Sequence, residues 1–318
     1  MPLIVRTHRP PPPPVSPADD RYPIQVTYID PDGVEWPWSD PTSGIIVTSV
    51  TGIGSPPASY TGIALPDGGS LAQSYTAASR QIVIGLHVFD EESQAGLLDK
   101  IDRLARALWT ERAGVPAPGM LVFARPNGTV RQIEVYCTSG PEQTDTDATR
   151  NAYQVSTDYA LTFVSALDPL FVDQEVVGPI VFEPPPPSGA GVPPMPPVLL
   201  KPRSSLGTTQ VTNEGNGDAY PVWKLYGPGA PTVTNVTTGR SFSVEELSEG
   251  EVVTVDTRPG RQSAIDQDGN DRWGDLVKTS PRDLWVLPSG TSVLELEIAN
   301  ADAGAKIELT YARRWLRA

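Results

Sequence analysis

The sequence predicts a mainly β protein of the α+β type. An N-terminal mixed β domain with one long helix precedes a C-terminal antiparallel β-sandwich. Three observations support this prediction. Most apolar residues alternate with polar ones, as in strands that bury one face. Helical spacing is clear over residues 90–112. The 318 residues include 35 prolines and 28 glycines, which favour turns and linkers over long helices.

Proline-rich stretches divide the chain into domains. Residues 1–20 form an arm with a proline run from Pro10 to Pro14, and residues 183–203 form a linker that is also rich in proline. Such segments favour extended, semi-rigid conformations and do not build a core. We therefore expect an N-terminal domain over 21–182 and a C-terminal domain over 204–318.

The N-terminal domain begins with alternating segments that read as strands. YPIQVTYID (22–30) ends at a hairpin-like turn, Pro31-Asp32-Gly33, and GIIVTSVTGIG (44–54) is the next strand. RQIVIGLHVF (80–89) is longer, and its alternation predicts one apolar face made of Ile82, Ile84, Leu86 and Val88.

The apolar period then changes to that of a helix, over Asp90 to Arg112. The acidic residues near its start and the basic residues near its end suit the helix dipole, and Gly114 and Pro116 end it. The predicted apolar stripe consists of Leu97, Leu98, Ile101, Leu104, Ala105 and Leu108.

Strands resume after the helix. GMLVFARPNGTVRQIEVYCT (119–138) predicts a hairpin that turns at Pro126-Asn127-Gly128, and YQVSTDYALTFVSA (153–166) predicts another strand. ALDPLF (166–171) closes the region. The sequence therefore places one helix inside a mostly β domain.

The C-terminal half has no convincing helix and reads as an antiparallel sandwich. Leu294, Leu296 and Ile298 alternate with glutamates in SVLELEIA, which predicts one inward face. The predicted strands are TTQVTN, PVWKLYG, EVVTVDT, DLWVLPSG, SVLELEIA and AKIELTYARRW. The cluster Asn213 to Asp218, followed by Pro221, predicts a turn that leads the chain into the strand PVWKLYG.

Charge and composition exclude several classes of protein. The formal net charge of −14 disfavours sequence-specific nucleic-acid binding, because that function uses basic patches. No apolar run approaches the ~20 residues that span a bilayer. The first residues lack the apolar core of a signal peptide, so we expect the protein to begin in a cytoplasm.

Residues suited to catalysis or metal binding are scarce. A zinc site needs three or four ligands, whereas His8, His87 and Cys137 are all the histidines and cysteines of the chain. His87 and Cys137 both lie in alternating runs, which predict an outward histidine and a buried thiol. No nucleophile elbow, P-loop or complete dinucleotide loop is present. We predict no catalytic, metal-binding or cofactor-binding residue.

Two further features each leave two interpretations open. The carboxylates of Asp266, Asp268 and Asp271 fit either a calcium loop or a hairpin turn, and the position of Gly269 departs from that of an EF-hand and favours the turn. Trp36 and Trp38 fit either a ligand platform or packing at a subunit or domain contact, which we favour. Trp273 fits either stacking on a sugar or capping the sandwich.

The N-terminal half resembles the distal tail proteins of long-tailed bacteriophages, the siphovirus tail component family. The carrying segments follow the family's order from the opening strands to the strand-then-helix element. They are IDPDGVEWPW, GIIVTSVTGIGSPP, PDGGSL, RQIVIGLHVFD with its helix, and ALDPLF.

The C-terminal half carries the strongest resemblance. VTNEGNGDAYPVWKLYG resembles the family's signature of asparagine, glycine and aspartate before a proline, a strand and a glycine. TNVTTGRSFSV, GEVVTVDTRPGRQ, WVLPSG and YARRWL follow in the family's order. The resemblance covers about residues 22–318. The arm and the 183–197 linker depart from the compact family pattern.

The resemblance implies a non-enzymatic structural protein without cofactors that forms a homo-hexameric ring at the virion tail tip, after assembly in the host cytoplasm. Its N-terminal domain would form the ring and its galectin-like C-terminal domain would project outward. The implied partners are the tail tube protein and the tail-associated hub protein, with the tape measure and receptor-binding or other minor tail proteins as further candidates. DNA would pass through the lumen without specific binding, and no membrane is involved.

Two other functions compete with this one. A carbohydrate-binding adhesin module of the virion would use the sandwich to hold host glycans, but the galectin sugar-binding pattern is not reproduced in this sequence. A tail-tip hydrolase would need a catalytic constellation that the sequence does not offer. Binding to glycans, turnover of wall material and formation of a discrete ring distinguish the three.

Overall fold

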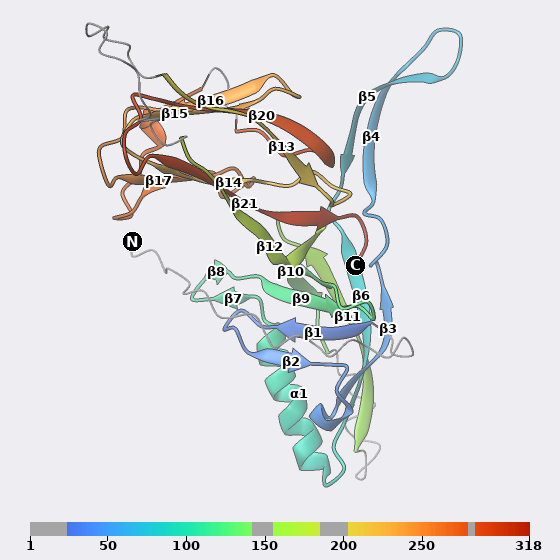
Figure 1. Ribbon diagram of the computed structural model, residues 1–318. Coiled ribbons are helices and arrows are strands. Elements are labelled where there is room, and N and C mark those ends of the chain that lie inside the picture. The colour runs from blue at the N-terminus through green and yellow to red at the C-terminus, as the bar shows by residue number, and fades with distance from the viewer. Residues whose placement is uncertain (1–23, 142–154, 185–202, 279–283) are drawn as a thin grey trace, which may run out of the picture. The chain divides into compact units, whose positions relative to one another are not determined.

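The computed structural model describes residues 24–141, 155–184, 203–278 and 284–318 (Figure 1). Within them the protein is mainly β with one α-helix, which confirms the predicted fold class. The predicted arm 1–20, with His8, and nearly all of the predicted linker 183–203 lie outside the described residues. No helix in the described part of the chain is long and apolar enough to cross a membrane.

The described residues belong to two compact units. The first contains 1–51 and 83–163, and the second contains 52–82 and 164–318. This division differs from the one expected at a linker near 183, because 164–182 group with the C-terminal residues. The physical reason is that β12 (Phe171–Phe182) pairs along its length with β21 (Lys306–Trp315), a C-terminal strand.

The first unit is built on a sheet with the strand order β2-β1-β9-β10-β11-β6-β3. Its strands are β1 (Gln25–Ile29), β2 (Glu35–Pro37), β3 (Ile45–Thr51), β6 (Gln81–Phe89), β9 (Gly119–Ala124), β10 (Val130–Ser139) and β11 (Ser156–Ser165). The apolar face predicted for β6 is confirmed, because Ile82, Ile84, Leu86 and Val88 are all fully buried. Short elements complete the unit: η1 (Pro41–Ser43), β7 (Glu111–Arg112) and β8 (Val115–Pro116).

Both predicted hairpin turns of this unit are present. β1 and β2 are antiparallel and are joined through a turn in which the Gly33 amide donates to the Asp30 carbonyl. β9 and β10 are joined in the same manner, with the Gly128 amide donating to the Arg125 carbonyl. Each glycine has a positive φ, which an L side chain rarely adopts and which explains the residue choice.

The predicted helix is α1 (Gln94–Leu108), shorter at both ends than the predicted 90–112. Ser93 is the N-cap, and its side chain accepts a hydrogen bond from the Gly96 amide. Asp90 lies before the helix and accepts from the amides of Glu92 and Ser93, so it organises the entry turn rather than the first helical turn. The predicted stripe was wrong at Leu98 and Ala105, which are both exposed. The buried side is Leu97, Ile101, Leu104, Ala107 and Leu108.

The second unit contains the predicted antiparallel sandwich, whose two sheets face each other in Figure 1. One sheet has the order β18-β17-β14-β21-β12, and the other β13-β20-β15-β16-β19. The strands not yet bounded are β13 (Arg203–Asn213), β14 (Val222–Tyr226), β15 (Ala230–Asn235), β16 (Arg240–Val244), β17 (Val252–Asp256), β18 (Ser263–Asp266), β19 (Leu276–Val277) and β20 (Gly290–Ala299). A short 3-10 helix, η2 (Trp273–Asp275), precedes β19.

Alternating strand residues from both sheets fill the core of the sandwich. The inward residues predicted for β20, Leu294, Leu296 and Ile298, are confirmed. β21 contributes Ile307, Leu309 and Tyr311 to the same core. The largest fully buried side chains of this core are Trp223 and Trp285, whose rings lie edge to face with centroids 5.4 Å apart. Such a core stabilises the unit by removing apolar surface from water.

The turn after Asn213 forms as predicted, and its chemistry is visible. The buried Asn213 side chain donates to the carbonyls of Gly217 and Leu287 and accepts from the Gly215 amide. A Cβ at Gly215 would lie 2.7 Å from the Arg314 carbonyl oxygen, so the close approach of two backbones requires glycine there. The turn fixes the entry of the chain into β14.

One predicted strand of the second half is absent. DLWVLPSG provides an isolated bridge, Leu287 with Ala219, instead of a strand. Pro288 lacks the amide that a ladder needs, while Trp285 and Leu287 still bury their side chains in the core. Its alternation therefore reflects packing of an irregular segment.

One element of the second unit was not predicted. β4 (Ala58–Ala64) and β5 (Ser70–Ala77) form a separate two-stranded antiparallel sheet, hereafter the β4–β5 hairpin, drawn as a long ribbon in Figure 1. Every residue of both strands is exposed. The sequence signal was the turn Pro66-Asp67-Gly68-Gly69 between two runs rich in Ser, Thr and Ala.

Candidate functional site

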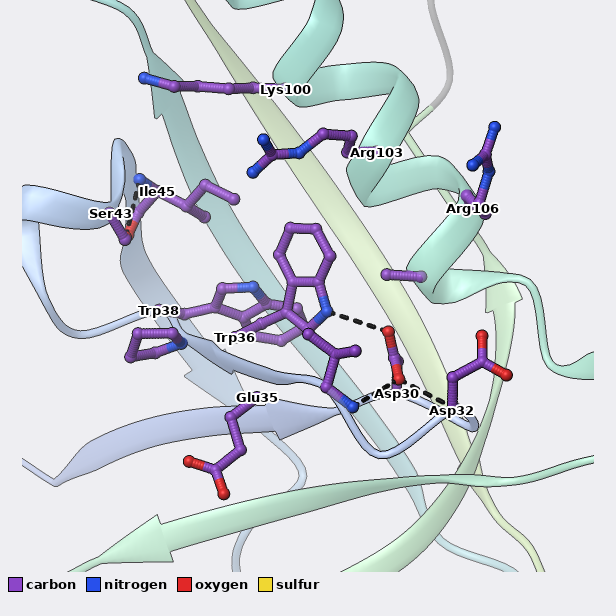
Figure 2. A pocket seen from close by; sticks show the side chains of 13 residues that line it. Asp30, Asp32, Glu35, Trp36, Trp38, Ser43, Ile45, Lys100, Arg103 and Arg106 are labelled. Atoms are coloured by element: carbon purple, nitrogen blue, oxygen red, sulfur yellow. Dashed lines mark hydrogen bonds between the residues drawn. The ribbon is translucent and has the colours of Figure 1, made fainter.

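The tryptophan predicted as a contact residue at position 36 borders a pocket of about 500 Å³ in the first unit (Figure 2). Asp30, at the end of β1, is buried and organises this region. One of its carboxylate oxygens accepts from the amides of Asp32 and Val34, at 3.0 and 2.9 Å, and the other accepts from the Trp36 indole at 3.2 Å. The β1–β2 turn therefore fixes the orientation of the Trp36 ring.

The walls of this pocket differ in charge (Figure 2). α1 supplies a row of cations, Lys100, Arg103 and Arg106, which recur at helical spacing and so lie along one side of the helix. The β1–β2 hairpin supplies carboxylates and the Trp36 ring, with Val34 and Ile45 adding apolar surface. A mixed lining of this kind suits contact with a protein segment.

Ion pairs hold the rim of the pocket. Arg112 binds Asp32 through two nitrogens, with Nη2 2.8 Å from Oδ2, and this hydrogen bonding lowers the pKa of Asp32. Lys100 lies 2.9 Å from Asp90. The hydrogen bond from Lys100, followed by those from the Ser93 and Glu92 amides, lowers the pKa of Asp90 to about 2. Both carboxylates stay charged throughout the neutral range.

Trp38 lies in a different environment from Trp36. Its side chain is fully buried in the first unit, stacked on Tyr28 with ring centroids 5.2 Å apart and tilted against Phe163 at 6.1 Å. Tyr28 in turn donates a hydrogen bond to the Ala107 carbonyl of α1. Trp38 also lines the pocket, but its side chain is fully buried in the single chain. The predicted contacts at Trp36 and Trp273 therefore remain the candidates for binding a neighbouring protein.

Trp273 lies in η2 at the periphery of the sandwich and packs against its core. The Lys278 ammonium lies 3.5 Å from the centre of the ring, a cation–π contact, and desolvation lowers the pKa of that lysine. Arg272, next in sequence, forms ion pairs with Glu251 and Asp275. This packing matches the capping interpretation, and stacking on a sugar would have to use the ring face opposite Lys278.

The residues weighed for chemistry do not assemble into a reactive group. His87 points outward from β6 as predicted, and its Nδ1 lies 2.8 Å from a carboxylate oxygen of the exposed Asp158. In the described ranges no group of three or more His, Cys, Asp and Glu side chains is placed to hold a metal ion. The contact between His87 and Asp158 is an exposed side-chain hydrogen bond, and exposed polar pairs of this kind contribute little to stability.

The carboxylate cluster after β18 is a turn. Asp266 accepts from the amides of Asp268 and Asn270 and from the Asn270 side chain, which lowers the pKa of its carboxyl. Gly269 follows with a φ of 86°. Both carboxylate oxygens of Asp266 and one of Asp271 accept hydrogen bonds from the loop's own donors, as expected for the hairpin interpretation.

Cys137 is half-buried, where the sequence predicted a buried thiol, and it is expected to react slowly with thiol reagents. Burial raises the pKa of its thiol to about 11, so at pH 8 the thiolate fraction is about two orders of magnitude below that of a free cysteine with a pKa near 8.5. Labelling with a chromogenic disulfide in native buffer and in denaturant measures this difference. Reaction at the same rate in both buffers would contradict the buried environment.

Two features with structural or contact roles escaped the sequence analysis. Arg80 reads as a surface charge before a strand, yet it is buried and bonds to carbonyls that are distant in the sequence. The β4–β5 hairpin exposes the large apolar residues Tyr60, Ile63, Leu71 and Tyr75. Its turn motif could have revealed the hairpin, whereas no local signal could have revealed the partners of Arg80.

Comparison with solved structures gives the chain a known fold. It is similar to the Dit protein of phage SPP1, described as a paradigm of the hub adsorption apparatus in phages that infect Gram-positive bacteria. The TM-score is 0.61 at 13% sequence identity, over 91% of this chain and 98% of that chain. It is also similar to a chain of the phage P2 baseplate in its activated conformation with Ca, with a TM-score of 0.51 at 9% identity, over 92% and 98% of the two chains.

Comparisons at the level of sequence gave no relatives. No family model matches the chain. No curated protein matches it either. The likeness is therefore one of fold, and it extends over nearly the whole of both chains being compared.

Proposed function

We propose that this chain is a structural subunit of a bacteriophage tail tip. The observation that carries the proposal is the likeness to the SPP1 hub protein, which spans 98% of that chain and 91% of this one. A likeness of that extent includes both units rather than one widespread module. The order of sequence motifs that resembles the distal tail family points to the same function independently.

Under this proposal the chain assembles as a homo-hexameric ring and is not an enzyme. The ring joins the tail tube protein to the tail-associated hub protein, and host-recognition proteins dock around it. Residues 21–182 make the ring contacts, and the sandwich of 204–318 projects outward. The mixed pocket beside Trp36 and the surface of Trp273 are contact sites for these neighbours, since neither offers a nucleophile paired with a base.

The charge of the chain suits a ring around a DNA path. Phosphates bind proteins through lysine and arginine, so a neutral to acidic wall lets duplex DNA pass without adhering to it. Each copy carries a formal net charge of −14. Screening at ~0.15 M salt limits such a field to ~8 Å, so residues near the lumen decide the effect.

The adhesin alternative has less support. Lys278 covers one face of the Trp273 ring, and the ring packs against the sandwich core, which leaves a reduced surface for a sugar. A glycan array probed with the full chain tests it directly. Specific binding to a glycan would favour the adhesin over a purely structural subunit.

The native mass of the purified full-length protein tests the proposal. We expect a particle of six copies of the 34.1 kDa chain, measured by native mass spectrometry or light scattering, with six-fold symmetry in electron micrographs. The physical reason is that a head-to-tail contact between identical subunits either closes into a ring or continues as a filament. A protein that stays monomeric at high concentration would contradict the proposed function.

A further inference from the structure

The β4–β5 hairpin differs from every other described strand of the second unit whose burial is given in being exposed throughout. Its strands pair with each other from Ala58–Ala77 at the base to Ala64–Ser70 near the tip. The turn is closed by hydrogen bonds between Leu65 and Gly69 and between Gly68 and Leu65. Within the described residues neither strand pairs with a third strand. An isolated two-stranded sheet is marginally stable in water.

The hairpin carries two apolar cross-strand pairs. Tyr60 lies opposite Tyr75, and Ile63 lies opposite Leu71. The exposed fractions of these residues are 53%, 75%, 51% and 61% in that order, and Leu65 adds 47% beside the turn. So much large apolar surface on one small element marks an interaction surface.

The two pairs lie on opposite faces of the hairpin. The Tyr60 hydroxyl is 2.7 Å from the Ser70 hydroxyl, so Tyr60 shares a face with Ser70. Leu71 follows Ser70 in the same strand, and successive side chains of a strand point to opposite faces. Ile63 follows Tyr60 by three positions in β4 and so lies on the other face, and the register shift between Thr61 and Gly62 brings Leu71 opposite Ile63. A partner that covers both apolar pairs must therefore contact both faces of the hairpin, which happens when the hairpin inserts into the partner.

The hairpin also lacks the charges that protect free strands. Natural proteins guard exposed edges with charged residues or with proline. Charged residues are 19% of the whole chain, yet in 58–77 Asp67, in the turn, is the one charged residue. An uncharged, apolar ribbon with two free edges has the composition of a segment that is covered in the working assembly.

We infer that the β4–β5 hairpin is a docking arm that binds a second copy of this chain, an inference that rests on the proposed function. The net charge supports a contact between copies at this uncharged pair of strands. Two copies that each carry −14 repel each other wherever their acidic surfaces meet, so they contact best through a segment without charge. A basic partner would instead be drawn to the acidic surface. Insertion of one copy's hairpin into the next is a head-to-tail contact, which closes a ring.

A polar variant of the full chain tests the arm. Replacing Tyr60, Ile63, Leu71 and Tyr75 by serine is expected to raise the concentration at which the ring assembles by about tenfold or more, because truncating clustered aromatic anchors weakens interfaces most. The variant should keep its thermal midpoint, since these side chains are exposed in the single chain. The matched control is alanine at Ser59 and Thr76, an exposed cross-strand pair of the same hairpin.

Hydrogen exchange gives a second measurement that does not depend on the variant. The amides of 58–77 should exchange slowly in the assembled wild-type protein and fast after dilution to single chains. A ring that assembles unchanged in the polar variant, or fast exchange of the hairpin inside the ring, overturns the arm. If the amides of the hairpin exchange slowly only when another tail protein or lipid vesicles are added, the hairpin does not bind a second copy of this chain. A wild-type protein that forms no ring contradicts the proposed function instead.

Discussion

Replacing Arg80 by alanine is expected to lower the free energy of unfolding by about 3–5 kcal/mol. The guanidinium is buried in the second unit and donates to the carbonyls of Pro169, Gly52, Gly54 and Leu316 at 2.5–2.8 Å. Alanine would leave these carbonyls without their donor, and each buried polar group left unpaired costs about 1–3 kcal/mol. Urea denaturation followed by circular dichroism measures the loss.

The cation itself is held by more than these bonds. The guanidinium carbon of Arg80 lies 4.5 Å from the centre of the Phe171 ring, within the range of a cation–π contact. Burial lowers the pKa of Arg80 to about 10, and the nearby charge of Asp168 opposes that shift. The side chain therefore remains protonated at neutral pH, and the carbonyls and the ring replace its lost hydration.

Two further variants test whether the loss of stability comes from the buried guanidinium of Arg80. Lysine at position 80 supplies one ammonium group in place of the planar fork, so it should recover part of the stability, about half. Alanine at Arg103, whose side chain is 63% exposed and 3.9 Å from Asp99, should change stability by about 0.5 kcal/mol or less. Equal losses from the Arg80 and Arg103 variants would contradict the role assigned to the buried guanidinium.

Arg80 illustrates what the sequence could not predict. A charged residue at the start of an alternating strand reads as a surface residue, because charged side chains are rarely buried. Its partners, Gly52, Pro169 and Leu316, meet it only through tertiary structure. Strands with one buried face were predicted well, as β6 and β20 show, since their alternation is a local signal.

The errors have equally physical causes. DLWVLPSG alternates but contains Pro288, which lacks the amide that a strand ladder needs, so packing overrode the pattern. The strands of the β4–β5 hairpin contain many Ser, Thr and Ala residues and no consistent apolar face, so they lack the pattern of a half-buried strand. A hairpin that is exposed on both faces leaves little trace in the periodicity of the sequence.

Trp36 and Trp38 were both predicted as candidate contact residues, but the structure places them in different environments. Trp36 and Trp38 are two positions apart, and strand geometry alone would place both rings on one side. Both residues line the pocket, but Trp38 follows the end of β2 and its ring is fully buried against Tyr28, whereas Trp36 is only partly buried. The sequence singled out both tryptophans as candidate contacts, and only the three-dimensional arrangement shows that the Trp38 side chain belongs to the core.

Replacing Trp38 by alanine is expected to lower the stability of the first unit by about 3–5 kcal/mol, the usual loss when a large buried aromatic side chain is truncated. Replacing Trp36 by alanine should cost about 1 kcal/mol, the worth of its hydrogen bond to Asp30. Cys137 lies in β10 of the first unit, so its labelling rate as a function of urea concentration reports on the unfolding of that unit.

A phenylalanine variant separates packing from polarity at Trp38. The indole Nε1 is buried and has no hydrogen-bond partner among the described residues, so phenylalanine removes an unpaired donor while it keeps a ring against Tyr28. We expect this variant to lose less than about 1.5 kcal/mol, because the change conserves aromatic character and most of the volume. A loss as large as that of alanine would show that Nε1 has a partner. The two tryptophans are distinguished by comparing stability with assembly. Alanine at Trp38 should shift the urea dependence of Cys137 labelling strongly, whereas alanine at Trp36 should hardly shift it but should weaken assembly of the ring.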